Sequence, residues 1–129
     1  MQFATSPDAP RPAGPYSHAV RVGGFVYTAG FGPQHPDTGE VPEGVVAQTR
    51  QVLENLRVAL RAVGAELDQV VKTTCHLRHP EADFAGFNEV YREFFDEPYP
   101  VRTTVGSELP GILVEIDAVA VSGDTAETA

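Results

Sequence analysis

Two segments of the chain repeat apolar residues at alternating spacings of three and four, the pattern that predicts an amphipathic helix. The first covers residues 45–63, and Gly64 is expected to end it. Polar residues such as Glu54 and Arg57 lie on the opposite side, where Glu54 can pair with its neighbours. The apolar stripe consists of Val46, Thr49, Leu53, Leu56, Leu60 and Val63.

The second predicted helix covers residues 84–95, with Asp83 as its N-cap. One stripe of this helix is aromatic, and its helical spacing assigns these side chains to the core. The stripe consists of Phe84, Phe87, Tyr91 and Phe94.

Shorter segments alternate apolar and polar residues, which predicts strands. Gly23-Gly24 separates two of them and indicates a two-residue hairpin. The expected strands are 19–22, 25–29, 71–77, 101–106 and 113–121, with Val71, Thr73, Cys75 and Leu77 on one side of the third. The resulting order, β-β-α-β-α-β-β, predicts a single α+β domain with both helices on one face of a mixed sheet.

The last predicted strand is apolar on both faces apart from Glu115 and Asp117. Strands of this kind are covered on both sides. The two helices can cover only one face of the sheet, and the rest of the sequence offers nothing for the other. We therefore expect another subunit to cover it.

Length and composition are those of one globular domain of 129 residues. Residues 1–15 are rich in Pro and Ala and predict an irregular arm, and the polar tail 123–129 is expected to fray. The start resembles no secretion signal, no apolar run could span a bilayer, and Cys75 is the single cysteine. These features favour a soluble, cytoplasmic protein.

The net charge of −9, from 18 acidic and 9 basic residues, restricts the classes of partner. Nucleic acids and acidic membrane surfaces would be repelled at long range, and no basic run opposes this. We therefore predict no nucleic-acid or membrane partner. A single arginine could still hold a small anion locally.

Glu115 and Arg102 are the two residues most open to a chemical interpretation. Glu115 interrupts an apolar strand, where a carboxylate is costly unless it has a partner. Arg102 begins a strand after Pro100, and its planar fork matches a carboxylate. The pattern alone leaves open whether these are surface residues of a sheet edge or residues of one cavity.

Eight short motifs occur in an order and spacing similar to those of the Rid/YjgF family, and the resemblance covers about residues 12–121. The motifs are Gly14-Pro15-Tyr16-Ser17, Tyr27-Thr28-Ala29-Gly30, Pro36-Asp37-Thr38-Gly39, Gln48-Thr49, Asn55-Leu56, Asn88-Glu89-Val90-Tyr91, Pro100-Val101-Arg102 and Val114-Glu115-Ile116. The resemblance implies a chorismate-mutase-like α+β fold and a homotrimer with active sites between subunits. It also implies hydrolysis of reactive 2-imino and enamine acids to 2-oxo acids and ammonia, without a cofactor.

By the same resemblance, Arg102 binds the carboxylate of the substrate and Glu115 positions the attacking water. The chemistry is consistent, because an iminium carbon is already electrophilic and needs only orientation and a polarised water. The remaining residues that the resemblance assigns to substrate binding are Tyr16, Ser17, Gly30, Phe31, Asn88 and Thr104.

The chain departs from the family pattern beside this predicted cleft. Ala29-Gly30-Phe31 stands where many members have Ser-Gly-Gln, and Thr104 stands where some have Cys. A hydroxyl and an amide are therefore missing, and no thiol takes part. The alternative function is a non-catalytic binder or sensor of small 2-oxo or imino acids in the same fold.

Cys75, His76 and His79 are close in sequence but do not form a predicted metal site. Neighbouring residues of a strand point to opposite faces, and His79 follows the end of the strand. We therefore predict neither a metal nor a cofactor.

Overall fold

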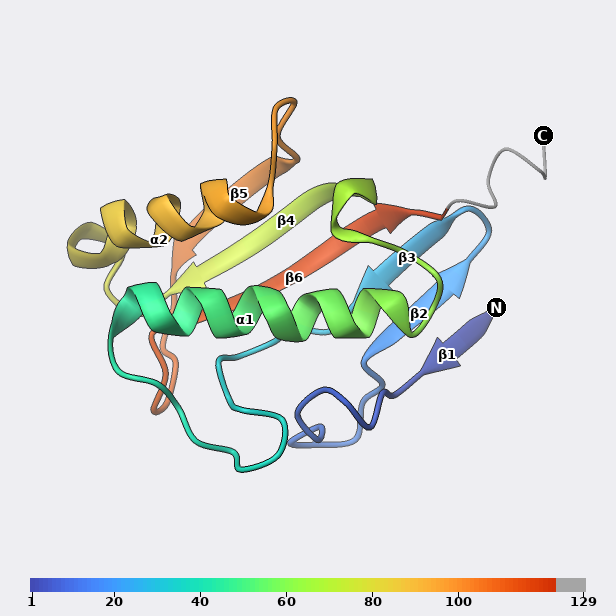
Figure 1. The fold of residues 1–129 in the computed structure, drawn as a ribbon, viewed down its shortest axis with the longest axis horizontal. Coiled ribbons are helices and arrows are strands. Elements are labelled where there is room, and N and C mark those ends of the chain that lie inside the picture. The colour runs from blue at the N-terminus through green and yellow to red at the C-terminus, as the bar shows by residue number, and fades with distance from the viewer. Residues whose placement is uncertain (123–129) are drawn as a thin grey trace.

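The computed structural model describes residues 1–122, and the predicted fraying of residues 123–129 lies outside the described residues. Figure 1 shows the helices packed against a sheet in one domain. The elements in chain order are β1 (Gln2–Ala4), β2 (Ala19–Val22), β3 (Phe25–Thr28), α1 (Gly44–Arg61), the short 3-10 helix η1 (Leu67–Gln69), β4 (Val70–Leu77), α2 (Pro80–Phe94), β5 (Val101–Gly106) and β6 (Val114–Val121).

The strands form one mixed sheet in the order β1-β2-β3-β6-β4-β5. The pair β4–β5 is parallel and the other neighbours are antiparallel. The last strand of the chain, β6, therefore lies inside the sheet between β3 and β4. The predicted α+β class is confirmed.

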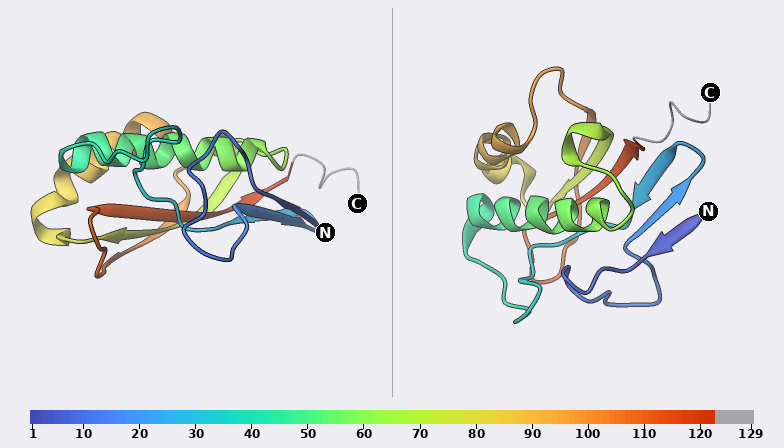
Figure 2. Two further views of the ribbon diagram at one scale, coloured as in Figure 1. Left: turned by 90° about the horizontal axis from the view of Figure 1, so that it is seen from below. Right: turned by 45° about the vertical axis from the view of Figure 1, so that its right-hand side comes forward.

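Both helices pack on one face of the sheet, as the sequence predicted (Figure 2). Alternate residues of β6 point toward them and are buried, among them Val114, Ile116 and Ala120, each 0% exposed. The other face is uncovered in a single chain. Its exposed apolar residues include Val22, Phe25, Tyr27, Val101 and Val105.

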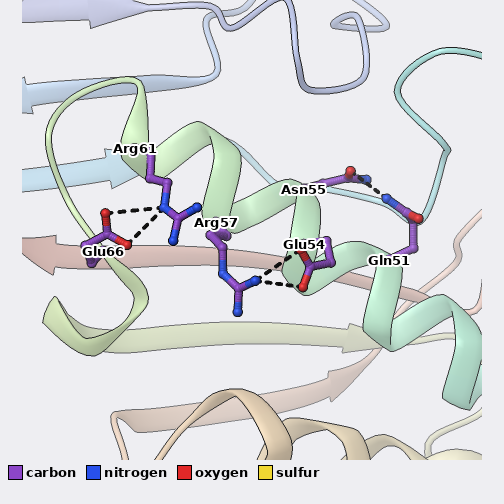
Figure 3. A network of polar contacts seen from close by, with 6 residues as sticks. All are labelled: Gln51, Glu54, Asn55, Arg57, Arg61 and Glu66. Carbon is purple, nitrogen blue, oxygen red and sulfur yellow. Dashed lines mark hydrogen bonds and ion pairs between the residues drawn. The ribbon is translucent and has the colours of Figure 1, made fainter.

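Helix α1 buries the predicted stripe from Thr49 onward, but Val46 in its first turn is 37% exposed. The opposite side carries the predicted ion pair: Arg57 Nη1 donates to Glu54 Oε1 at 2.9 Å (Figure 3). Gly64 follows the helix with a φ of +79°. Helix α1 itself ends at Arg61, two residues before the predicted end, with Ala62 as its C-cap. The left-handed conformation of Gly64, which favours glycine, lies in the turn that follows.

Two predicted boundaries were wrong. Residues Gln2–Ala4, assigned to an irregular arm, form strand β1 by pairing with Ala19–Arg21 at the edge of the hairpin. Helix α2 begins at Pro80, with His79 and not Asp83 as its N-cap. Proline suits the first helical position because its missing N–H would have had no partner there.

Two residues predicted to be buried are exposed. Val71 is 42% exposed because the register of β4 against β6 shifts between Val70 and Lys72, which places Val70 in the core instead. Phe84 is 45% exposed although the other aromatic residues of its stripe are partly or fully buried. No helix among residues 1–122 is long and apolar enough to cross a bilayer.

Candidate functional site

The predicted site residues line two separate hollows. Tyr16, Gly30, Phe31 and Glu115 contribute to the larger, of about 500 Å³. Asn88 and Arg102 contribute to the smaller, of about 260 Å³. Ser17 and Thr104 line neither of these two. We call the larger one the Glu115 hollow and the smaller one the Arg102 hollow.

The register of the sheet sets the direction of Arg102. It pairs with Thr73 of β4, whose side chain is fully buried beneath helix α2. Residues directly opposite one another in a sheet share a face. The side chain of Arg102 therefore lies on the helix-covered face, at the sheet edge formed by β5.

The guanidinium of Arg102 is surrounded by aromatic rings. Its Cζ lies 4.8 Å from the ring centroid of Tyr91, 5.3 Å from that of Phe87 and 5.8 Å from that of Phe84. Rings at this distance attract a cation through their electron-rich faces. Within residues 1–122, Arg102 has no ion-pair partner. Its charge is thus held in place but remains available to a ligand anion.

Tyr91 is fixed beneath Arg102 by its own hydroxyl, which lies 2.7 Å from Thr73 Oγ1. Burial raises the pKa of Tyr91 to about 12, although the hydrogen bond with Thr73 opposes the change. Tyr91 is therefore a neutral phenol at physiological pH, and its ring offers Arg102 a face without a competing negative charge.

Glu115 lies on the other face of the sheet. It pairs with His76 of β4, whereas its neighbours Val114 and Ile116 point into the core. Glu115 is half-buried and has no hydrogen-bond or ion-pair partner among the described residues. A partly desolvated carboxylate of this kind is suited to bind a water or a cationic group.

Gly30 allows the Glu115 side chain to occupy its position. A Cβ at residue 30 would lie 3.0 Å from Glu115 Cδ and 3.1 Å from Oε2, which is too close. The carboxylate thus packs directly on the backbone of residue 30, and a Cβ there would displace it by a few tenths of an ångström. The family resemblance assigns Gly30 to substrate binding, which stays a prediction; in the structure its backbone supports Glu115.

Phe31 lies at the Glu115 hollow, but its side chain belongs to the core and is only 5% exposed. Its backbone exchanges two hydrogen bonds with Ile116, at 2.9 and 3.1 Å. These bonds place residue 30 beside Glu115. Phe31 therefore positions the loop and offers the hollow little polar function.

Two buried polar residues fix the wall of this hollow. The ring of His18 accepts a hydrogen bond from Ser6 N–H at Nδ1 (3.0 Å) and donates from Nε2 to Pro10 O (2.8 Å), which ties the N-terminal arm to the sheet. Asn55 of α1 donates from Nδ2 to Gly32 O at 3.0 Å and to Gln34 O at 2.9 Å. Figure 3 shows its third bond, with Gln51.

The exposed face next to Glu115 carries further titratable groups. Asp117 faces the same side, as predicted, and burial raises its pKa, while the nearby His76 and Lys72 lower it. His76 Nδ1 is hydrogen-bonded to Ser107 Oγ at 2.7 Å, and Lys72 Nζ donates to Thr103 Oγ1 at 2.9 Å. Cys75, in contrast, is buried on the helix side, so it does not meet His76.

Arg102 and Glu115 do not meet within one chain, because they lie on opposite faces of the sheet. Their predicted meeting in one pocket therefore requires a second chain and remains a prediction. Ser17 is exposed, and the buried Thr104 Oγ1 has no hydrogen-bond partner. Thr104 shares the face of Arg102, two residues further along β5.

The fold and the two hollows define a small α+β protein with an uncovered sheet face and, in the two hollows, an arginine and a glutamate that have no ion-pair partner among residues 1–122. The family model described as Endoribonuclease L-PSP matches residues 6–122. The chain thus belongs to this family, which is the YjgF/RutC, or Rid, family.

Individual relatives agree with this assignment. A RutC family protein of Pyrococcus horikoshii is 47% identical over 116 residues, which cover 88% of this chain and 91% of the relative. A protein of Dermatophagoides farinae named 2-iminobutanoate/2-iminopropanoate deaminase is 39% identical over 123 residues, which cover 93% and 95%.

Solved structures confirm the fold. The structure of RidA from Psychrobacter has a TM-score of 0.89 at 39% identity, covering 94% of this chain and 99% of that one. The structure of TdcF from E. coli with bound serine also has a TM-score of 0.89, at 38% identity, covering 95% and 100%.

The sequence did not reveal the roles of three kinds of residue. His18 and Asn55 hold irregular segments through backbone bonds, which no periodic pattern announces. The aromatic stripe of α2 was assigned wholly to the core, whereas three of its rings also surround Arg102. Its nearness to Arg102 in sequence, across one loop, was the available signal.

Proposed function

We propose that the protein hydrolyses small 2-imino and enamine acids to 2-oxo acids and ammonia, without a cofactor. The observation that carries the proposal is the presence of an unpaired Arg102 and an unpaired Glu115, each lining a hollow, in a chain of the Rid family. The name of the 39% identical relative, an iminobutanoate deaminase, supports the same chemistry.

Arg102 binds the carboxylate next to the imine. Its fork donates two parallel hydrogen bonds, which fix the orientation as well as the distance of the substrate. The aromatic rings around the guanidinium support this role, because they hold the cation without neutralising it.

Glu115 acts on the water. The water oxygen bonds to the iminium carbon while the carboxylate takes one proton, giving a neutral carbinolamine. The protonated Glu115 then returns the proton to nitrogen, the C–N bond breaks, and ammonia leaves as the hydroxyl proton is lost and the carbonyl forms. Iminium and water thus become a 2-oxo acid and an ammonium ion.

The two residues come from different protomers of a homotrimer. This follows from the proposal because one chain holds Arg102 and Glu115 on opposite faces of its sheet. The uncovered face supports an assembly, since it exposes Phe25, Tyr27 and Val101 at 46%, 45% and 66%. A cyclic arrangement would repeat the same contact three times and create three sites.

The test of the chemistry is imine hydrolysis. An amino-acid oxidase generates 2-iminobutanoate, and semicarbazide traps the imine that is not hydrolysed. We expect the protein to suppress trapping, and Arg102→Ala to lower kcat/KM at least about 100-fold through the loss of two charge-assisted hydrogen bonds. Trapping equal to that in buffer, or an Arg102→Ala variant equal to wild type, contradicts the proposal.

The test of the shared site mixes two inactive variants, Arg102→Ala and Glu115→Gln, under conditions that exchange subunits. A site built from two protomers regains both residues in mixed trimers, and random assortment would restore about a quarter of wild-type activity. A site built within one chain regains nothing. Light scattering gives the mass independently, and a monomer would exclude the shared site.

A non-catalytic binder of small 2-oxo or imino acids is the second candidate, favoured by residues 29–31. Ala29 offers no hydroxyl, and Phe31 is buried, so neither supplies a polar side chain to the Glu115 hollow. For such a binder, calorimetry would find that 2-oxobutanoate binds and that binding depends on Arg102. The imine-hydrolysis assay would find no turnover. An RNA substrate is disfavoured by the net charge of −9.

A further inference from the structure

The Arg102 hollow contains a second guanidinium that the proposed reaction does not use. Its lining residues are Asn88, Tyr91, Arg92, Tyr99, Pro100 and Arg102. Among the residues that the structure describes, Arg92 and Arg102 are thus the charged groups of this wall, and no carboxylate lines it. That is unusual in a chain with twice as many acids as bases.

The placement of Arg92 follows from the helix. Asn88, Tyr91 and Arg92 occupy positions i, i+3 and i+4 of α2, which lie on one side of the helix. Tyr91 is the residue whose ring lies 4.8 Å from Arg102 Cζ. The side of α2 that supports Arg102 therefore also presents Arg92 to the same hollow.

Neither guanidinium is neutralised within the described chain. Neither Arg92 nor Arg102 has an ion-pair partner in residues 1–122. The acid next to Arg92 in sequence, Glu93, is bonded to Arg50 of α1, with both oxygens 2.9 Å from Nη2. Glu93, the acid that follows Arg92 in sequence, is thus engaged with α1 and not with Arg92.

We propose that this hollow selects substrates with a second acid group, namely the 2-imino derivatives of dicarboxylic amino acids. Arg102 binds the carboxylate next to the imine, and Arg92 binds the carboxylate at the end of the side chain. Two like charges without acids between them match two negative charges on one ligand. The hollow of about 260 Å³ is the part of the site that one chain forms.

The inference rests on the proposed function for its reaction but can be tested by binding alone. Calorimetry compares 2-oxoglutarate with 2-oxopentanoate, which has the same chain length and no terminal carboxylate. We expect 2-oxoglutarate to bind about 10-fold more tightly, the effect of one charge-assisted contact. Arg92→Ala should abolish this preference and leave the binding of 2-oxopentanoate unchanged.

Arg61→Ala is the matched control, since it removes the same charge from an exposed site on α1. The Arg61→Ala variant should keep the preference for 2-oxoglutarate over 2-oxopentanoate. Equal binding of the two acids by wild type, or an equal loss of preference in both arginine variants, overturns the inference. An Arg92→Ala variant that binds both acids more weakly by the same factor also overturns the inference.

A kinetic comparison separates this inference from the proposed function. Amino-acid oxidases generate the imines of glutamate and of norvaline, whose hydrolysis is followed by semicarbazide trapping. If neither imine is hydrolysed but the Arg92-dependent preference for 2-oxoglutarate remains, the proposed function fails and the diacid site stands. If both are hydrolysed with equal kcat/KM and bind equally, the diacid site fails and the deaminase stands.

Discussion

The Arg102 hollow and the Glu115 hollow hold opposite charges by different physical means. Arg102 rests against three rings of one helix, so its support is a set of apolar side chains at regular spacing. Glu115 rests on the backbone of Gly30, in a loop that Asn55 and Phe31 fix by hydrogen bonds to main-chain atoms. The apolar contacts around Arg102 should therefore persist when one ring is replaced by a similar side chain. The position of Glu115 instead depends on the missing side chain of Gly30 and on individual hydrogen bonds to backbone atoms.

The largest effect on activity is expected at Gly30, which supports the Glu115 side chain. In Gly30→Ala the new methyl group would lie 3.0 Å from Glu115 Cδ, and the flexible carboxylate would move aside. We expect kcat/KM for imine hydrolysis to fall about 30-fold, less than the roughly 100-fold cost of a 1 Å misplacement, because the carboxylate need move only a few tenths of an ångström, while the folded content by circular dichroism stays unchanged. Gly14→Ala is the control, since its methyl group would lie 3.8 Å from Tyr16. Equal activity of both variants would mean that Glu115 does not act.

The next effect is expected at Asn55, which supports the loop of the Glu115 hollow. Asn55→Leu leaves two partly buried carbonyl oxygens, those of Gly32 and Gln34, without their donor. We expect the free energy of unfolding in urea to fall by about 2 kcal/mol. Gln51→Ala removes only the bond to Asn55 at the helix surface and should cost less than about 1 kcal/mol. The reverse ranking would contradict this account of the loop.

A smaller effect is expected at Phe84, an exposed ring whose centroid lies 5.8 Å from Arg102 Cζ. Phe84→Leu should weaken the binding of 2-oxobutanoate about 3-fold, the size of an exposed cation–π contact, and Phe84→Trp should restore or improve it. Calorimetry gives both affinities. Phe3→Leu removes a more exposed ring on β1 and serves as the control. If leucine and tryptophan at position 84 bind the acid equally, the ring does not act on Arg102.

The smallest effect concerns Tyr91 and is confined to alkaline pH. Burial raises the pKa of Tyr91 from 10.0 to about 12, so the folded protein holds this proton more tightly than the unfolded chain. The resulting stability is complete below pH 10 and is lost as the pH rises through about 12. Urea unfolding between pH 9 and 12 should therefore show a steeper loss in wild type than in Tyr91→Phe. Parallel curves would contradict the assignment.

The periodic parts of the chain could be predicted from the sequence. The stripe of α1 and the alternation of β6 each follow from one repeated spacing, and the structure confirms both helices on one face of the sheet. Local exceptions could not be predicted. The register shift between Val70 and Lys72 turns Val71 away from the core. Strand β1 forms because the hairpin beside it offers an edge for pairing, and not because its three residues favour a strand.

The candidate site was predictable in its residues but not in its geometry. Glu115 stood out as a carboxylate in an apolar strand and Arg102 as a cation at the start of one, but only the family resemblance assigned them to one site; neither has an ion-pair partner among residues 1–122. Their opposite faces follow from the pairing of β4 with β5 and β6, which depends on partners that are distant in sequence. Such register is a property of the assembled sheet, and no local pattern contains it.

The position of β6 has a consequence for biosynthesis. Residues 114–121 leave the ribosome after the other five strands of this sheet, yet they separate the hairpin of β2 and β3 from the pair of β4 and β5. Until they emerge, the nascent chain consists of two partial sheets, each with an open edge that can pair with other chains. A message truncated before the codon of Val114 would therefore yield an aggregating product and not a smaller version of the domain.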